Sequence, residues 1–361
     1  MEELFVTRTS MPSFEEYCQA IRPLWDSHIL TNMGPLHQQL QARLEDFLEG
    51  PVSLYANGHL ALEALLEGLQ LPRGSEVITS PFTFVSTTHA LVRQGLVPVF
   101  CDVLEADGTL DPDGVEALLT ERTSAILPVH VYGHPCQVEA LEALARKHGL
   151  PLLYDAAHAF GVRYKGVPLV RYGDASILSF HATKVFSTIE GGAVCFADER
   201  FRQPLQDLSN FGIRDADHCE AVGGNAKLNE FQAAMGLCNL RHFSEEVALR
   251  RTAFEEYLAC LPPSVRVLQP REGTEGNYAY CPAVLESQTA RDRAFAALKA
   301  QGIHPRKYFY PLTSQAGCYM GRFRGHTPVA AQLASRVLCL PLFPGLPPGT
   351  PEKIASLVAR N

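Results

Sequence analysis

The sequence predicts an α/β protein, in which helices cover both faces of a mostly parallel sheet and a smaller C-terminal α/β domain follows. Two observations lead to this fold class. Between about residues 57 and 196, segments with helical periodicity alternate with short apolar runs that are typical of buried strands. Beyond about Leu240 the pattern changes to longer helices, a stretch rich in Pro and Gly over residues 261–276, and a second α/β segment. We therefore expect a large domain over residues 1–240 and a small domain over residues 241–361.

The expected elements follow in order along the chain. Helices are expected where apolar residues recur at helical spacing, and strands where they form a short run. The helices are expected over residues 61–69, 85–94, 115–119 and 138–148, and the strands over residues 77–78, 97–100, 125–127, 150–154 and 175–180. Farther on, Asn229 is expected to cap a helix in which Gln232 occupies the reciprocal capping position.

Composition excludes several classes of protein. With 361 residues, of which 46% are hydrophobic, the chain can bury a sizeable core, and its net charge of −8 argues against a nucleic-acid partner. No apolar run approaches the roughly 20 residues that cross a bilayer, so no membrane partner is expected. The N-terminus, Met1 to Leu4, is acidic where a secretory signal would be basic, and the ten cysteines form no CxxC pair. We expect a cytoplasmic protein with reduced thiols.

Two expected strands end in residues that can carry chemistry. Residues 152–154 lead into Asp155 and His158, and residues 175–180 lead into His181 and Lys184. In parallel sheets the ligand crevice lies outside the carboxyl ends of the strands, so these side chains are expected to converge. A desolvated lysine is a nucleophile and a base, and an aspartate facing a pyridine nitrogen keeps it protonated. Taken singly, each residue is more simply a helix cap or a solvated turn residue.

Other motifs have simple structural readings as well. Asn57-Gly58-His59 precedes a helix whose first amides favour an anion, although an ordinary Asn cap followed by Gly explains it equally. Phe84 follows a strand and can stack on a planar cofactor or belong to the core. His130 and His134 are four residues apart but not on a helix face, and no third ligand is evident, so we expect structural roles and no metal. GxSxG, Walker and GxGxxG motifs do not occur.

The segment Ser179-Phe-His-Ala-Thr-Lys184, continuing to Gly192, resembles the cofactor-lysine segment of the DegT/DnrJ/EryC1/StrS sugar aminotransferases. Further stretches resemble the same family in the same order and span nearly the whole chain. They are Thr31–Pro35, Pro81–Val85, Asp155–His158, Gly224-Asn225 with Glu230–Ala234, and Leu340–Phe343. The resemblance implies a fold-type I aminotransferase with a mixed, mostly parallel sheet, dependent on pyridoxal 5′-phosphate (PLP). It also implies a homodimer whose active sites are shared between the subunits.

The resemblance assigns roles to individual residues. Lys184 would bond to PLP as a Schiff base, and Asp155 would pair with the pyridinium nitrogen. The other expected cofactor-binding residues are His158 at the ring hydroxyl, Gly58, His59 and Ser179 at the phosphate, Phe84 on the ring face, and Asn225 at the phosphate of the neighbouring subunit. The expected substrate-binding residues are Asn32, His181 and Tyr310.

Two positions depart from the family pattern. His59 stands where many members have Thr or Ser, so a hydroxyl contact to the phosphate is missing. Ala226 stands where many have a bulky aromatic residue, which changes the expected shape of the interface pocket. Lys184 itself separates this chain from the family's dehydratases, in which the lysine is a histidine.

The resemblance implies transamination in which L-glutamate is converted to 2-oxoglutarate and a nucleotide keto sugar receives the amine. His181 and the segment Tyr308–Pro311 look most like those of enzymes that make dTDP-4-amino-4,6-dideoxyglucose from the 4-keto-6-deoxy sugar. Such deoxyamino sugars enter lipopolysaccharide O-antigens. The alternatives are a GDP- or UDP-linked sugar, a 3-keto sugar, or a PLP-binding regulator without turnover; a nicotinamide-dependent oxidoreductase lacks its glycine fingerprint.

Overall fold

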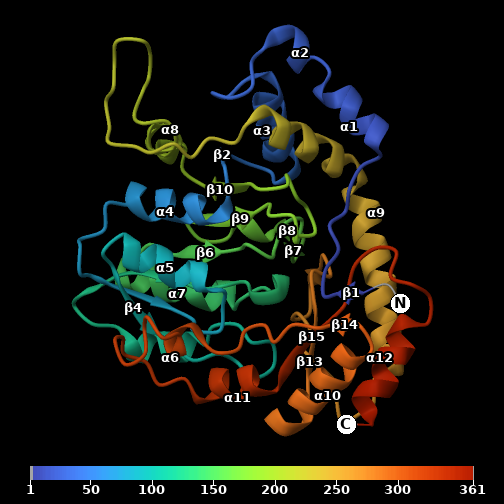
Figure 1. Cartoon of the computed structure of the whole chain (residues 1–361). Helices are drawn as coiled ribbons and strands as arrows, with labels where there is room; N and C mark the ends of the chain where they lie inside the picture. The colour runs from blue at the N-terminus through green and yellow to red at the C-terminus, as the bar shows by residue number, and fades with distance from the viewer. Residues whose placement is uncertain (1–2, 361) are drawn as a thin grey trace.

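The computed structural model describes residues 3–360. At its centre lies a sheet of four and three strands joined by isolated bridges, which Figure 1 shows between the helices. Met1, Glu2 and Asn361 lie outside the described residues. The expectation about the acidic N-terminus, Met1 to Leu4, therefore falls partly outside them. The sheet has the strand order β4-β3-β5-β6-β9-β10-β2, and bridges between Ile126 and Leu152 and between Val129 and Asp155 join β5 to β6. The strands are β2 (Val52–Tyr55), β3 (Glu76–Thr79), β4 (Val97–Phe100), β5 (Thr123–Leu127), β6 (Leu153–Asp155), β9 (Ala175–Ser179) and β10 (Gly192–Phe196).

The sheet is mixed and mostly parallel, as expected. Neighbouring strands from β4 through to β9 run parallel, whereas β10 is antiparallel to both β9 and β2. Successive strand residues point to opposite faces, and both faces are buried. Ile78, Ile126 and Leu178 belong to one apolar cluster, while Val77 and Ile177 belong to another.

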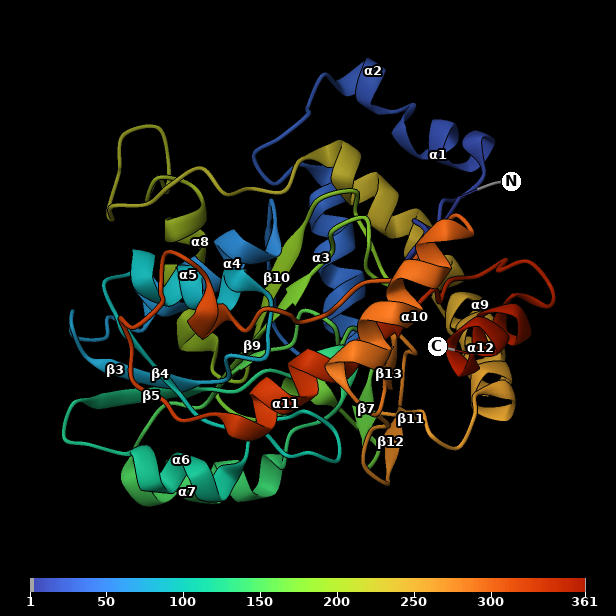
Figure 2. The same cartoon turned by 60° about the horizontal axis from the view of Figure 1, so that its bottom comes forward.

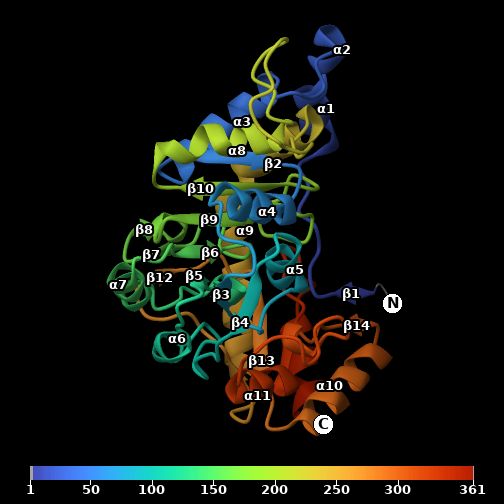
Figure 3. The same ribbon diagram turned by 90° about the vertical axis from the view of Figure 1, so that its left-hand side faces the viewer.

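Helices cover the two faces separately, which Figure 3 shows with the strands seen between them. Apolar side chains of α4 (Gly58–Gly68), α5 (Val85–Arg93) and α8 (Arg202–Ser209) pack on one face. Those of α3 (Pro35–Phe47), α6 (Pro112–Leu118), α7 (Val138–His148) and α9 (Glu230–Cys260) pack on the other. The predicted helices and strands are all present, with shifted ends. For example, α6 begins at Pro112, because Asp111 caps it and proline fits the first helical position.

The C-terminal part forms its own core around a three-stranded antiparallel sheet, in the order β11-β13-β15. It is joined to the large body by α9, whose N-terminus carries the predicted capping box of Asn229 and Gln232. Residue 240 lies inside this helix, and the division of the chain at that point stays a prediction. The elements here are β11 (Arg266–Val267), β13 (Cys281–Val284), β14 (Ile303–His304), β15 (Val337–Leu340), α10 (Gln288–Ala300), α11 (Pro328–Arg336) and α12 (Thr350–Ala359).

Two segments project from the body at the end where α2 lies (Figure 2). One is the N-terminal arm with α1 (Phe14–Ile21) and α2 (Leu24–Ser27), and the other is the loop between α8 and α9. The remaining elements are β1 (Leu4–Phe5), which pairs with β14, the small strands β7 (Arg163–Tyr164), β8 (Val167–Pro168) and β12 (Thr274–Glu275), and the 3₁₀ turns η1 (Val131–Gly133), η2 (Leu169–Arg171), η3 (Glu199–Phe201) and η4 (Thr313–Gln315). Among residues 3–360, no helix has the length and apolar character needed to span a membrane.

Candidate active site

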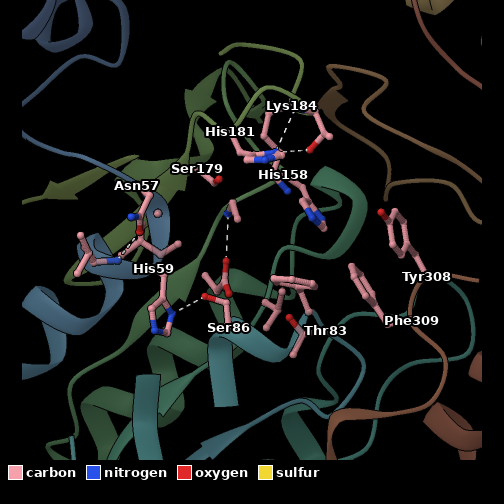
Figure 4. Close-up of a pocket in the computed structure, with 18 of the residues that line it drawn as sticks. Asn57, His59, Thr83, Ser86, His158, Ser179, His181, Lys184, Tyr308 and Phe309 are labelled. Carbon is pink, nitrogen blue, oxygen red and sulfur yellow. Dashed lines mark hydrogen bonds between the residues drawn. The ribbon is translucent and has the colours of Figure 1, made fainter. Parts of the chain in front are cut away.

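A cavity of about 700 Å³ lies at the carboxyl ends of the central strands (Figure 4). Its walls come from the residues that follow β2, β3, β5, β6 and β9, which is where the parallel-sheet rule places a ligand crevice. Figure 4 shows His59 and Ser86 at one end of the cavity and Tyr308 and Phe309 at the other. The expected convergence of the residues after β6 and β9 is therefore observed.

Asp155 ends β6 and is buried. Its Oδ2 accepts a hydrogen bond from the Thr87 hydroxyl at 2.7 Å, and its Oδ1 accepts one from the backbone N–H of Ala157 at 3.1 Å. Burial raises the pKa of Asp155, against the two hydrogen bonds and the Lys184 charge, which lower it. A buried carboxylate with few compensating charges is stabilised by a cationic ligand, and a protonated pyridine nitrogen is one.

Lys184 lies half-buried in the turn after β9, where its backbone N–H donates to the carbonyl oxygen of His181 at 2.8 Å. Burial lowers the pKa of the Lys184 amine to about 8, while the Asp155 carboxylate opposes this shift. A fraction of the amine is therefore neutral at physiological pH. A neutral amine facing a cavity is a nucleophile and a base.

His158 is buried beside the same cavity. The backbone N–H of Tyr132 donates to its Nδ1 at 3.1 Å. Burial lowers the pKa of His158 well below its usual value, and the charges of Lys184 and His134 lower it further. A neutral ring that accepts at Nδ1 carries its proton on Nε2, so His158 can donate a hydrogen bond from Nε2 to a ligand oxygen.

Three chain segments approach one another closely at the other end of the cavity. A Cβ on Gly58 would lie 2.9 Å from the Cβ of Ser179, and a Cβ on Gly192 would lie 2.6 Å from backbone atoms of Gly58. The side chain of Asn57 caps α4 by accepting from the backbone N–H of Leu60 at 2.9 Å. This glycine-lined start of a helix is an anion-binding arrangement, because the first-turn amides and the helix dipole both favour negative charge.

The side chain of His59 is engaged by its neighbours. Its Nδ1 lies 2.8 Å from the Ser86 hydroxyl oxygen, and its Nε2 lies 3.4 Å from a Glu63 carboxylate oxygen. Arg93 also forms an ion pair with Glu63. His59 thus lines the cavity from a position fixed by both α4 and α5. Phe84, the N-cap residue of α5, lines the cavity with 58% of its surface exposed, so its ring is accessible to a planar ligand.

His181 lies at the mouth of the cavity and is nearly half exposed. Its Nδ1 is 2.9 Å from the Thr183 hydroxyl oxygen, and its Nε2 is 3.5 Å from Glu190. This position suits a residue that contacts a substrate bound over the cavity. The Glu190 carboxylate beside it adds an acceptor at the same rim.

Three of the expected site residues lie outside the lining of this cavity in the described chain. Tyr310 packs under the guanidinium of Arg291 at 4.6 Å from its ring centroid, while Tyr308 and Phe309 line the cavity. Asn225 is exposed on the loop after α8, where its side chain accepts from Lys227 at 3.0 Å. Asn32 is exposed between α2 and α3. Their roles stay predictions.

Sequence reasoning missed several residues of the site. Thr87 holds the carboxylate of Asp155, and the Thr83 hydroxyl lies 2.9 Å from that of Thr87. Both hydroxyls follow β3, Thr83 before the N-cap Phe84 and Thr87 in the first turn of α5, and polar residues directly after a parallel strand were an available signal. Other lining residues that only the fold brings in are Glu63, Ser86, Arg93, Tyr280 and Arg306.

His130 and His134 are buried and bonded to the backbone. The N–H of Cys136 donates to Nδ1 of His130 at 3.1 Å, and Nδ1 of His134 lies 3.2 Å from the carbonyl oxygen of Asp107. Burial lowers the pKa of His130 to about 3 and that of His134 to about 4. Over residues 3–360, no group of three or more His, Cys, Asp or Glu side chains is arranged to hold a metal ion.

The side chains that line the cavity have the chemistry needed to bind PLP. An amine with a lowered pKa suits bonding to an aldehyde, and a buried carboxylate of raised pKa suits a pyridinium nitrogen. The glycine-lined start of α4 suits a phosphate, and Phe84 suits the ring face. The volume also leaves room for a substrate beside the cofactor.

Comparison with known proteins shows the family to which the chain is similar. Residues 13–359 match the model of the DegT/DnrJ/EryC1/StrS aminotransferase family. A dTDP-4-amino-4,6-dideoxy-D-glucose transaminase of Shigella dysenteriae is 38% identical, over 98% of this chain and 98% of that protein. A UDP-N-acetyl-3-dehydro-alpha-D-glucosamine 3-aminotransferase of Acidithiobacillus ferrooxidans is 34% identical, over 93% of this chain and 90% of that protein.

A solved structure has the same fold. The crystal structure of DesI in the presence of its TDP-sugar product superposes with a TM-score of 0.94 at 35% identity, over 99% of this chain and 92% of that one. A likeness that extends over both parts of the chain confirms the predicted fold class.

Proposed function

The chain belongs to the DegT/DnrJ/EryC1/StrS aminotransferase family, and on that premise we propose that it aminates carbon 4 of a nucleotide-linked 4-keto-6-deoxy sugar with L-glutamate as donor. It is a PLP-dependent nucleotide-sugar aminotransferase. The observation that carries the proposal is the pairing of a buried Asp155 with a Lys184 of lowered pKa at the carboxyl ends of β6 and β9.

When bound, PLP supplies an electron sink for the carbanion that forms when a proton leaves the carbon bearing nitrogen. Asp155 would hold the proton on the pyridine nitrogen, because hydrogen bonds from Thr87 and Ala157 fix its carboxylate. His158, whose Nδ1 accepts from the backbone N–H of Tyr132, would donate from Nε2 to the ring hydroxyl oxygen. The two residues would thus orient the ring and maintain its charge.

The neutral amine of Lys184 moves the protons. Its Nζ takes the proton from the α-carbon of glutamate, and in the return direction it delivers a proton to carbon 4 of the sugar. Burial lowers the pKa of the amine to about 8, close to neutral pH, so the amine can both accept and release a proton. Because the Lys184 amine is held in the site, proton transfer at the α-carbon of glutamate and at carbon 4 of the sugar needs no encounter with a base or acid from solution.

The choice of carbon 4 rests on the residues at the mouth of the cavity. The imidazole of His181 stands at this mouth, within reach of groups beside the reacting carbon. The Shigella relative, named for a 4-amino sugar, supports a dTDP-linked 4-keto-6-deoxyglucose as acceptor, whereas the Acidithiobacillus relative, named for a 3-amino sugar, represents the competing regiochemistry.

The proposal includes a homodimer with shared sites in the cytoplasm, serving lipopolysaccharide O-antigen synthesis. The exposed position of Asn225, away from the cavity of its own chain, supports a role at the cavity of a partner. All ten cysteines are free in the structure, which fits a reducing compartment. The division into domains at residue 240 likewise remains part of the proposal.

The test offers dTDP-4-keto-6-deoxyglucose, its 3-keto isomer and the GDP- and UDP-linked 4-keto sugars in separate reactions with glutamate. We expect 2-oxoglutarate and a 4-amino sugar, identified by NMR, from the dTDP-linked 4-keto sugar. Efficient amination of the 3-keto sugar alone overturns the regiochemistry. Failure to form 2-oxoglutarate with every sugar overturns the proposed activity.

A further inference from the structure

The phosphate end of the cavity contains a hydroxyl that the resemblance to the family did not predict. Many family members carry Thr or Ser at the position of His59, and this chain has no hydroxyl there. Ser86, in the first turn of α5, lines the same cavity, and its hydroxyl oxygen lies 2.8 Å from Nδ1 of His59. A hydroxyl is thus present at the start of α5, beside the start of α4 that lacks one.

We propose that Ser86 donates the hydrogen bond to the cofactor phosphate that residue 59 cannot make, and that His59 is the positioning residue for its hydroxyl. This inference rests on the proposed function, since it concerns the cofactor of that reaction. It assigns Ser86 to binding and not to proton transfer.

The arrangement of the two helices supports this role. The contact between His59 and Ser86 brings the first turns of α4 and α5 together beside the cavity. Phe84, the N-cap residue of α5, makes no side-chain capping bond, and of the amides in the first turn that of Thr87 donates to the Phe84 carbonyl oxygen at 3.3 Å. The starts of α4 and α5 thus lie side by side at this end of the cavity, and a helix start favours negative charge.

The proposal fixes which way the hydrogen bond between His59 and Ser86 points. For the Ser86 hydroxyl to donate to a phosphate, Nδ1 of His59 must be the donor to the Ser86 oxygen. A Glu63 carboxylate oxygen lies 3.4 Å from the other ring nitrogen, Nε2. Arg93, which pairs with Glu63, and His89 of α5 are the other ionisable groups near the ring.

The decisive experiment measures the binding of pyridoxamine 5′-phosphate, which forms no bond with Lys184, by isothermal titration calorimetry. Ser86→Ala is expected to weaken binding about 10-fold, as for the loss of one hydrogen bond to a charged group. Ser335→Ala, which removes an exposed hydroxyl in α11, is the control and is expected to bind as the wild type does. Wild-type affinity in Ser86→Ala overturns the proposal.

A second pair of variants tests the exchange of hydroxyls. His59→Thr in the Ser86→Ala background restores a hydroxyl at the first helix start, and we expect it to recover most of the lost affinity. A purely structural role of the pair predicts no recovery, since the contact between residues 59 and 86 stays lost in the double variant. Affinity at or below that of Ser86→Ala in the double variant therefore counts against the proposal.

A further measurement separates this inference from the proposed function. Pyridoxal, which lacks the phosphate, should bind wild type and Ser86→Ala alike, and a loss of pyridoxal binding in the variant overturns the assignment to phosphate. If the wild type itself binds neither compound, the proposed function fails instead.

Discussion

Two regions of the active site, the inner wall and the rim of the cavity, differ in burial. The inner wall, made by Asp155, His158 and Lys184, is enclosed and its groups have fixed partners or shifted pKa values. The rim, made by Phe84 and His181, is exposed, and the loop that carries Asn225 is exposed outside the cavity of its own chain. In the proposed function the inner wall moves protons, which burial favours. The rim would recognise ligands, which requires access.

Exposed apolar side chains accompany the rim. Val222 is 91% exposed and Phe211 is 46% exposed on the loop between α8 and α9, and Trp25 on the projecting arm is 63% exposed. Both segments project from the same end of the molecule, where α2 lies (Figure 2). Clustered exposure of this kind is typical of interaction surfaces, and it agrees with the proposed homodimer.

The largest expected effect removes the proton carrier of the inner wall. Lys184→Ala should lower turnover by about 10⁴-fold or more, because one residue serves as both base and acid. Borohydride should fix PLP to the wild type but not to this variant, which absorbance and mass spectrometry check. Lys299→Ala, an exposed lysine of α10, should leave turnover unchanged. Wild-type conversion of glutamate by Lys184→Ala would refute the assignment.

The next effect concerns the charge behind the ring. Asp155→Asn is nearly isosteric and keeps an acceptor for Thr87, yet it removes the carboxylate that holds the pyridinium proton. We expect turnover to fall by about 10²–10³-fold with the fold retained, as for other losses of preorganised electrostatics. Steady-state kinetics and circular dichroism provide the measurement. Unchanged turnover would mean that the ring is oriented differently.

A smaller effect is expected at the rim. Asn225→Ala should weaken PLP binding about 10-fold, the cost of one hydrogen bond to a charged group. Mixed with Lys184→Ala, it should recover activity, because a hybrid dimer contains one site with Lys184 and the partner's intact Asn225. Activity of the mixture after proven subunit exchange is the measurement. Absence of any recovery would place Asn225 outside a shared site.

The smallest expected effect is a gradual dependence on pH of the rate at which Lys184 reacts with PLP. The pKa of Lys184 is about 8 in the folded protein without cofactor, so its amine is charged below that pH and neutral above it. Capture of PLP, followed by absorbance, should therefore accelerate up to about tenfold per pH unit below pH 8 and level off above it. An exposed lysine would instead show this rise near pH 10. A rate that keeps climbing to pH 10 would contradict the burial of the amine.

The sequence by itself determined the alternation of strands and helices and the residues that follow the strands. These features are short-range: periodicity defines each element, and the residue after a parallel strand necessarily lies at the carboxyl edge of the sheet. Asp155 and Lys184 could thus be predicted to meet, and they do. The reversed direction of β10 and the extension of α9 to 31 residues were not specified by local pattern.

The tertiary structure alone decided how the site residues are held. Thr87 reaches Asp155 across 68 positions of the sequence, and Ser86 reaches His59 across 27. Such contacts depend on how α4 and α5 pack on the sheet, and no spacing within either segment records that packing. The shifted pKa of Lys184 has the same origin, because desolvation is a property of the assembled cavity and not of the residue.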